Sequence, residues 1–246
     1  MPLSTLSQRM REWFQPVPEP GGGPLFTVVI PTFHAADKLE RSIASVLRQP
    51  RELWELVVVD GGSEDGTAGV LRAHAGEIAC AISEPDAGVY DAMNKGVARA
   101  SGRYLYFLGA GDILRDGALE RVAACIPRRG IGFVYGNVFM RDRNVVWDGA
   151  WTAQKFRTRT PCQQAVFYDR RVFARHGGFE LRYPTLADYA LNIRCFGDCR
   201  VEKIFVNDII ADYEGGGLSA SCRDERFHEE RPALLQRHLG IKPKRK

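Results

Sequence analysis

Asp112 is the residue whose place in the sequence most directly indicates chemistry. It follows a short aromatic-rich run, Tyr104 to Leu108, and then the three small residues at 109–111. Small residues let a ligand approach the backbone, and a carboxylate at the carboxyl end of a parallel strand stands where open α/β sheets bind their ligands. The pattern predicts a ligand-binding acid. The alternative is a strand-to-helix turn in which Asp112 only caps the next helix.

The stretch from Ser83 to Asp112 predicts a loop, a helix and a strand that together position this acid. It reads SEPDAGVYDAMNKGVARASGRYLYFLGAGD. Apolar and amide side chains recur in it at intervals of three and four residues, which places them on one helix face: Tyr90, Met93, Asn94, Val97 and Ala98. Gly102 ends the helix. The run at 104–108 suits a strand buried between layers better than a half-exposed one.

Strands and helices also alternate before this stretch. Continuous apolar runs predict strands at 25–30 and 56–59, and a third lies near 78–82. Helices are expected around 39–47 and around 70–71. Asp60 closes the second strand, before a Gly-Gly-Ser turn that permits positive φ. The alternation over residues 25–126 predicts an α/β fold with right-handed crossovers, a mainly parallel sheet and a nucleotide-binding half.

Residues 127–220 have a different pattern and predict a mixed α/β half. A hairpin is expected from 133–140 to 145–147 across the turn RDRN, with strands near 165–168 and 201–206 and helices near 170–176 and 187–196. Residues 1–24 are expected to form an amphipathic extension with a Pro/Gly linker, outside the domain at 25–220. Residues 221–246 predict a charged helix, interrupted near Pro232, with a basic tail.

Length and composition are those of a globular protein that can bury a large core: 246 residues, 45% hydrophobic and 26% charged. With 34 basic and 30 acidic side chains, the net charge of +4 is too mild to indicate a nucleic-acid partner. The absence of a membrane-spanning run and of a signal-peptide core predicts a cytoplasmic protein. The six cysteines lack a second ligand pair, so reduced thiols are expected rather than a zinc site.

An ordered set of motifs resembles the family 2 glycosyltransferases, which have the GT-A fold. The matching pieces are VVIPTF (28–33), SVLRQ (45–49), LVVVDGGSEDGT (56–67), the 83–112 stretch, VYGNV (134–138), TPCQQAVF (160–167), GGFE (177–180) and LADYALNIR (186–194). The form SEPDAGVYDAMNKG with FLGAGD is similar to enzymes of bacterial surface-polysaccharide synthesis. The resemblance implies hexosyl transfer from a nucleotide-sugar donor to a hydroxyl of a saccharide or lipid-linked saccharide acceptor.

The resemblance implies a donor pocket in the first half. Pro31, Thr32 and Phe33 are expected to line it, and Asp60 is expected to accept a hydrogen bond from the base. A carboxylate accepts well from the imide N–H of uracil, so a uridine diphosphate sugar is the expected donor. The alternative for Asp60 is a cap on the following turn.

Two residues after the third strand are further candidates for donor contact. Asp86 is expected in the loop that crosses the nucleotide, and the alternative is an Asx-turn before Gly88. Lys95 is expected to face the diphosphate, and the alternative is a solvated helical lysine.

The resemblance also implies that Asp112 binds a divalent cation, Mg²⁺ or Mn²⁺. The cation would offset the charge that grows on the departing nucleoside diphosphate. The family usually carries further acids just before this position, where the present chain has Gly109 and Gly111. One carboxylate can still hold such an ion, since these cations keep several waters and use phosphate oxygens of the substrate.

A general base is implied as well, because an acceptor hydroxyl is a poor nucleophile until its proton is taken. Asp188 matches the family's base at the start of a late helix, where the helix macrodipole also favours an acid. Asp112 and Asp188 on opposite sides of the sugar would permit in-line displacement with inversion. Asn137 and Gln164 are expected near the acceptor, and the alternative for Asn137 is a structural amide.

Other hypotheses concern the ends of the chain and the overall function. Residues 212–221 resemble a segment that closes over the donor, with plain loop glycines as the alternative. The first amphipathic segment and the basic tail are hypothesised to contact anionic lipid at the membrane. A non-catalytic nucleotide-sugar-binding module is the alternative function, suggested by the missing acids at 109, 111 and 187. A methyltransferase, suggested by VVVDGG, lacks the expected Gly-rich loop.

Overall fold

The computed structural model describes residues 23–216 and 222–242. The predicted amphipathic extension, the end of the 212–221 segment and the basic tail therefore lie outside the described residues. The strands are β1 Phe26–Thr32, β2 Trp54–Asp60, β3 Cys80–Ser83, β4 Tyr104–Phe107, β5 Ile113–Leu114, β6 Ile131–Met140, β7 Val145–Trp147, β8 Val166–Asp169 and β9 Val201–Tyr213. The α-helices are α2 Ala36–Leu47, α3 Thr67–Ala73, α4 Val89–Arg99, α5 Ala118–Cys125, α6 Arg171–His176, α7 Ala187–Gly197 and α9 Glu225–Leu239. Short 3₁₀ helices are η2 Arg51–Leu53, η3 Ala153–Arg157 and η4 Gln163–Ala165.

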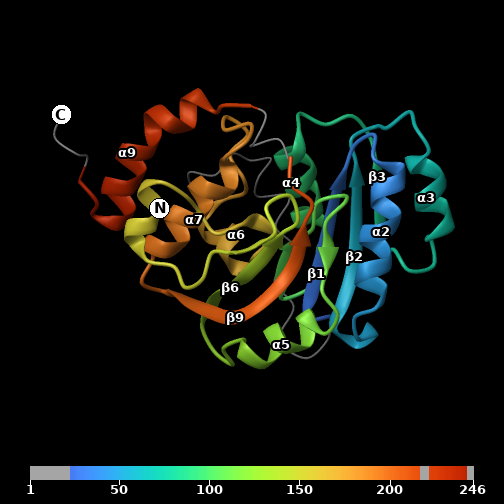
Figure 1. The fold of residues 1–246 in the computed structure, drawn as a ribbon, viewed down its shortest axis with the longest axis horizontal. Coiled ribbons are helices and arrows are strands. Elements are labelled where there is room, and N and C mark those ends of the chain that lie inside the picture. The colour runs from blue at the N-terminus through green and yellow to red at the C-terminus, as the bar shows by residue number, and fades with distance from the viewer. Residues whose placement is uncertain (1–22, 217–221, 243–246) are drawn as a thin grey trace.

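The described strands join in a single mixed sheet in the order β3-β2-β1-β4-β8-β6-β9-β5, with β7 paired to β6 (Figure 1). Strands β3, β2, β1 and β4 are mutually parallel, whereas β8 runs antiparallel to both β4 and β6. The predicted parallel sheet of the first half and the mixed sheet of the second half are both confirmed. The sheet continues from the first half into the second through the pairing of β4 with β8.

The core lies on both faces of the sheet because its strands are buried on both sides. Along β1, Val29 packs toward α4, while Val28 and Ile30 pack toward α2. This alternation is the two-residue period of a strand. Gly96 of α4 lets the helix approach β1 closely, because a Cβ there would overlap the side chain of Val29.

Strand β9 is much longer than predicted. The sequence predicts an end at Val206, because Asn207 and Asp208 interrupt the apolar run. In the structure the strand continues to Tyr213, and a register shift against β6 between Tyr135 and Asn137 accommodates the polar residues. A bulge of this kind absorbs extra residues without ending the pairing. Strand β5, which no sequence pattern indicated, pairs antiparallel with the end of β9.

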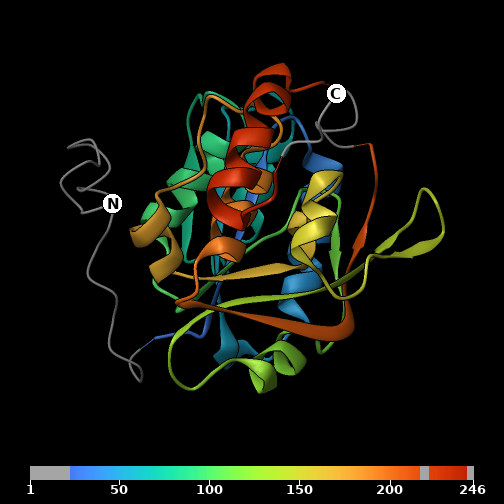
Figure 2. The same cartoon turned by 90° about the vertical axis from the view of Figure 1, so that its left-hand side faces the viewer.

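Helix α9 packs against α7 (Figures 1 and 2) and is not interrupted at Pro232, so that prediction was wrong. Proline removes its own N–H from the helix. The turns on either side are held by burial of Phe227 and Leu235. The ring of Phe227 contacts those of Tyr183 and Tyr189, so this C-terminal helix completes the core of the second half.

Candidate active site

The carboxyl ends of β1 and β4 are where sheets of this kind usually bind a ligand. From β1 the chain crosses to β2 on one side, whereas β4 lies on the other, which makes a topological switch point between them. Helix α2 fixes the turn after β4 through Ser42. Its hydroxyl accepts from the N–H of Gly111 at 2.9 Å and donates to the carbonyl of Asp112 at 2.8 Å.

Asp112 is a buried carboxylate in that turn. Its Oδ1 accepts from the backbone N–H of Glu214 at 2.9 Å. Burial raises the pKa of Asp112 to about 6, although hydrogen bonds from Glu214 and from the Gln164 side chain act in the opposite direction. The capping alternative was wrong, since the next helix, α5, begins at Ala118 without a side-chain cap.

The two glycines that replace acids each have a carboxylate lying over them. A Cβ on Gly109 would come within 2.6 Å of Oδ2 of Asp112. A Cβ on Gly111 would overlap the carboxylate of Glu214. The space that side chains at 109 and 111 would fill thus already holds negative charge. Glu214 belongs to the 212–221 segment that was expected near the donor, but its contact with Asp112, which is 102 residues away along the chain, was not predicted.

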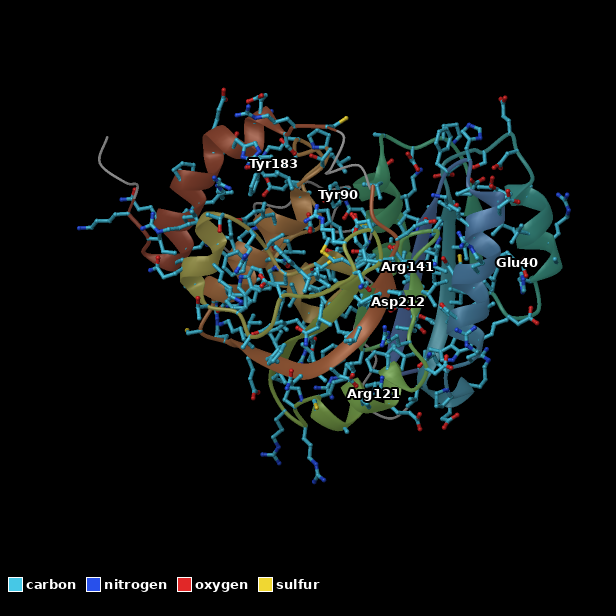
Figure 3. The ribbon with its side chains drawn as sticks, viewed as in Figure 1. Glu40, Tyr90, Arg121, Arg141, Tyr183 and Asp212 are labelled. Carbon is cyan, nitrogen blue, oxygen red and sulfur yellow. The ribbon has the colours of Figure 1, made fainter. Side chains whose placement is uncertain are left out.

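Asp188 lies in the first turn of α7, as predicted, and is buried. The hydroxyl of Tyr90, on α4, donates to its Oδ1 at 2.6 Å and also lies 3.0 Å from the carbonyl of Thr185. Burial raises the pKa of Asp188 to about 6, and the Tyr90 hydrogen bond limits the rise. Figure 3 shows Tyr90 in the central part of the molecule, whereas Glu40 lies at its outer side.

Asp224 fixes the backbone just before Asp188, a role that no sequence pattern indicated. Its carboxylate accepts from the N–H of Thr185 and of Leu186, each at 3.2 Å, and also from Phe227 at the start of α9. One carboxylate therefore joins the starts of α7 and α9. The orientation of the candidate base depends on the C-terminal helix.

The segment Cys162–Gln164 lies near both acids. The pKa of the Cys162 thiol is raised to about 12, chiefly by burial, and the charges of Asp112 and Asp188 both add to the rise. The Gln164 side chain hydrogen-bonds to Asp112, and its expected contact with the acceptor stays a prediction. The side-chain amide of Gln163 instead lies 3.1 Å from the hydroxyl of Tyr168, which donates to Oδ1 of Asn192 at 2.7 Å, and the other end of this buried amide has no hydrogen-bond partner.

Asp60 occupies the turn-capping role that was its alternative. It is 0% exposed, and its two oxygens accept from the N–H and the hydroxyl of Ser63 and from the hydroxyl of Ser83. These three donors engage both oxygens, and the carboxylate is fully buried, so it is not accessible to a nucleotide base in this conformation.

Asp86 is partly exposed, whereas Asp60 is fully buried. Its Oδ1 accepts from the N–H of Gly88 at 2.8 Å, which is the expected Asx-turn. Its Oδ2 lies over Gly61, where a Cβ would come within 2.7 Å of it and within 3.1 Å of the ring of Phe33. The Phe33 side chain is 60% exposed. An aromatic face and a carboxylate oxygen therefore lie together at the end of β1 and β2.

The remaining predicted residues divide between ligand-accessible and structural positions. The Oγ1 of Thr32 is buried without a hydrogen-bond partner, which is unusual for a polar group and suits a ligand contact, beside the buried Pro31. Lys95 pairs with Glu84 at 2.9 Å and donates to the carbonyl of Pro85, so it fixes this loop, and its contact with a diphosphate stays a prediction. Asn137 accepts from the N–H of Gly149 at 2.7 Å, which is the structural alternative.

Comparison with known proteins decides the family. The model of Glycosyl transferase family 2 matches residues 27–184. This chain belongs to glycosyltransferase family 2. It is 40% identical over 226 residues to a PGL/p-HBAD biosynthesis glycosyltransferase of Mycobacterium tuberculosis, covering 89% of this chain and 88% of that protein. It is 33% identical over 115 residues to the putative teichuronic acid biosynthesis glycosyltransferase TuaG of Bacillus subtilis, 46% of each chain.

Solved structures confirm the GT-A fold of this glycosyltransferase. S. aureus TarS in complex with UDP-GlcNAc is similar with a TM-score of 0.68 at 16% identity, over 89% of this chain and 68% of that chain. The chain spans 44% of the longer TarS chain. Glucosyl-3-phosphoglycerate synthase of Mycobacterium tuberculosis, with Mg²⁺ and UDP, has a TM-score of 0.60 at 18% identity, over 90% and 82%. Among the described residues, none of the helices has the length and apolar character that a bilayer crossing needs.

Proposed function

We propose that this glycosyltransferase moves a sugar from a uridine diphosphate donor to an acceptor hydroxyl with inversion at the anomeric carbon. The observation that carries the proposal is the pair of buried carboxylates, Asp112 in the turn after β4 and Asp188 at the start of α7, whose charges both act on the Cys162 thiol. Asp188 takes the proton of the attacking hydroxyl, since a base with a pKa near the working pH is effective. Asp112 would hold the cation that offsets charge on the departing diphosphate.

The donor base is proposed to lie against Phe33 and Asp86. The free Oδ2 of Asp86 would accept from the imide N–H of uracil, and the exposed Phe33 ring would stack on the base. Asp86 takes the role expected of Asp60, whose carboxylate is fully buried. TarS has been solved with UDP-GlcNAc, and glucosyl-3-phosphoglycerate synthase has been solved with UDP.

A divalent cation could bind here only if phosphate oxygens of the substrate and water supplied most of its ligands. The described residues hold no cluster of three or more His, Cys, Asp or Glu side chains suited to a metal. Asp112 would be a protein ligand, and diphosphate oxygens and water would complete the shell. When bound, the cation would offset charge on the leaving group. The solved synthase contains Mg²⁺ or Mn²⁺ in separate complexes with UDP.

The acceptor is proposed to be a saccharide or a lipid-linked saccharide that hydrogen-bonds to the unpaired end of the buried Gln163 side-chain amide. The carboxylates over Gly109 and Gly111 weaken the argument for a non-catalytic module, because negative charge is present despite the missing acids. A cytoplasmic location and membrane contact through the termini stay predictions. Sedimentation of the full chain with anionic vesicles checks the second, and a chain that stays in the supernatant would contradict it.

UDP with Mn²⁺ is expected to stabilise the enzyme most in a thermal-shift panel of nucleoside diphosphates. A ligand that binds only the native state at a hundred times its Kd adds about 2.7 kcal/mol. For a chain of this size the melting temperature would rise on the order of 5–10 °C. Asp86→Asn should reduce the shift for UDP, and Asp60→Asn is a poor comparison because it disrupts a buried turn. No shift with any nucleotide would contradict the proposed donor.

The rate of transfer is expected to fall steeply below about pH 6. Both carboxylates must be ionised for transfer, and burial raises the pKa of each to about 6. Below that pH both groups become protonated over the same range, and each protonation lowers kcat/KM. The logarithm of kcat/KM should then approach a slope of 2 against pH. Tyr90→Phe removes a hydrogen bond that lowers the pKa of Asp188, so its profile should move to higher pH. An acid limb near pH 4 in the parent would argue against both assignments.

A further inference from the structure

Two basic side chains of α2 converge on Glu214 beside the donor site. Lys38 Nζ lies 3.0 Å from Oε2 of Glu214, and Arg41 Nη2 lies 3.4 Å from Oε1. Lys38 and Arg41 are three residues apart, which places them next to each other on one helix face. Each carboxylate oxygen thus meets a different cation, an arrangement in which two neighbouring cations hold one anion.

The same anion is tied to the candidate cation ligand. The N–H of Glu214 donates to Asp112 at 2.9 Å, and its carboxylate lies over Gly111. Ser42, on the same helix as the two cations, fixes that turn from the other side. Lys38 and Arg41 are therefore positioned beside the atoms that the departing diphosphate would reach.

The contacts with Glu214 are weak enough to exchange. The side chains of Lys38, Arg41 and Glu214 are 51%, 47% and 31% exposed, and exposed ion pairs contribute about 0–1 kcal/mol each. A diphosphate carries more charge than one carboxylate and presents several acceptor oxygens. Glu214 follows the last residue of β9 and precedes Gly215, whose φ of 93° lies in the left-handed region. Its side chain can leave without breaking a strand pair.

We propose that Lys38 and Arg41 form the binding site for the donor's diphosphate, and that the carboxylate of Glu214 holds this site in the free enzyme and is displaced by the donor. The inference rests on the proposed function, because it needs the diphosphate to lie at Asp112. Lys38 and Arg41 of α2 would then offset part of the negative charge of the diphosphate. A metal ion held by further acids would otherwise offset that charge. Glu214 is then a competitor of the substrate.

Calorimetric titration of the full chain with UDP and with uridine, each with EDTA and with Mn²⁺, tests the site. Lys38→Met and Arg41→Met are each expected to weaken UDP binding about tenfold and leave uridine binding unchanged, because uridine has no phosphate. Glu214→Gln is expected to tighten UDP binding several-fold in EDTA. Arg48→Met is the matched control, since Arg48 lies directly after the same helix and pairs at 2.8 Å with Asp116, away from Glu214.

The outcomes separate the inference from the proposed function. If the parent binds UDP and uridine but Lys38→Met and Arg41→Met bind UDP as tightly as Arg48→Met, the inference is overturned and the donor assignment stands. If Glu214→Gln weakens UDP binding only with Mn²⁺, Glu214 is a cation ligand and not a competitor, which also overturns it. If the parent binds neither nucleotide under any condition, the proposed function itself fails. Melting temperatures check that each variant is folded.

Discussion

Asp188→Asn is expected to lower kcat for sugar transfer by a factor of about 10²–10⁴, the usual contribution of a general base. The amide cannot take the proton of the acceptor hydroxyl, yet it keeps the shape of the side chain and a hydrogen bond with Tyr90. The Kd for UDP should stay within about twofold, because Asp188 does not contact the proposed donor site. Single-turnover transfer and calorimetric titration of UDP measure the two quantities.

Stability distinguishes loss of the base from loss of the fold. Burial raises the pKa of Asp188 from 3.8 to about 6, so the folded state binds this proton more tightly than the unfolded state does. Ionisation of Asp188 therefore lowers the free energy of unfolding. The loss is absent below about pH 4, grows between about pH 4 and pH 6, and reaches about 3 kcal/mol above that range. Asp188→Asn should melt at a higher temperature than the parent at pH 8, and at the same temperature at pH 4. A variant with parental kcat would place the base elsewhere.

Asp112→Asn is expected to weaken Mn²⁺-dependent UDP binding by a factor of about 10–100, the range seen when a metal site loses a supporting group. Within the described residues Asp112 is the carboxylate that the geometry offers to the cation in the turn after β4. Uridine binding should not change, because the proposed base site at Phe33 and Asp86 is separate. Titration of UDP with and without Mn²⁺ gives the metal-dependent part directly.

Asp116→Asn is the control for this prediction. Asp116 lies in the connection that leads to α5, is exposed and pairs with Arg48, so its loss should leave UDP binding unchanged with or without Mn²⁺. An Asp112→Asn enzyme that keeps the full effect of Mn²⁺ would mean that the cation binds through other groups. An equal loss with and without Mn²⁺ would mean that Asp112 acts through the local backbone and not through a metal.

The sequence by itself determined the fold class, the family and the positions of the two acids. Continuous apolar runs indicate buried strands, and Asp112 and Asp188 follow from where those elements end or begin. The sequence signals for these features are local, because an apolar run and a helix start are each recognised from a few consecutive residues. The strand at 104–108 and the helix start at 187 are therefore found in the structure almost where the pattern predicts them.

The tertiary structure decided which side chains are free to bind. Asp60 was expected to accept from the base, but Ser63 and Ser83 engage its oxygens, while Asp86 reaches over Gly61 with one oxygen unused. Likewise Glu214 is brought to Gly111 by the length of β9, which a bulge against β6 allows. A residue type shows which hydrogen bonds a side chain can make, whereas the competitors for those bonds come from distant parts of the chain. Only the packed chain brings them together.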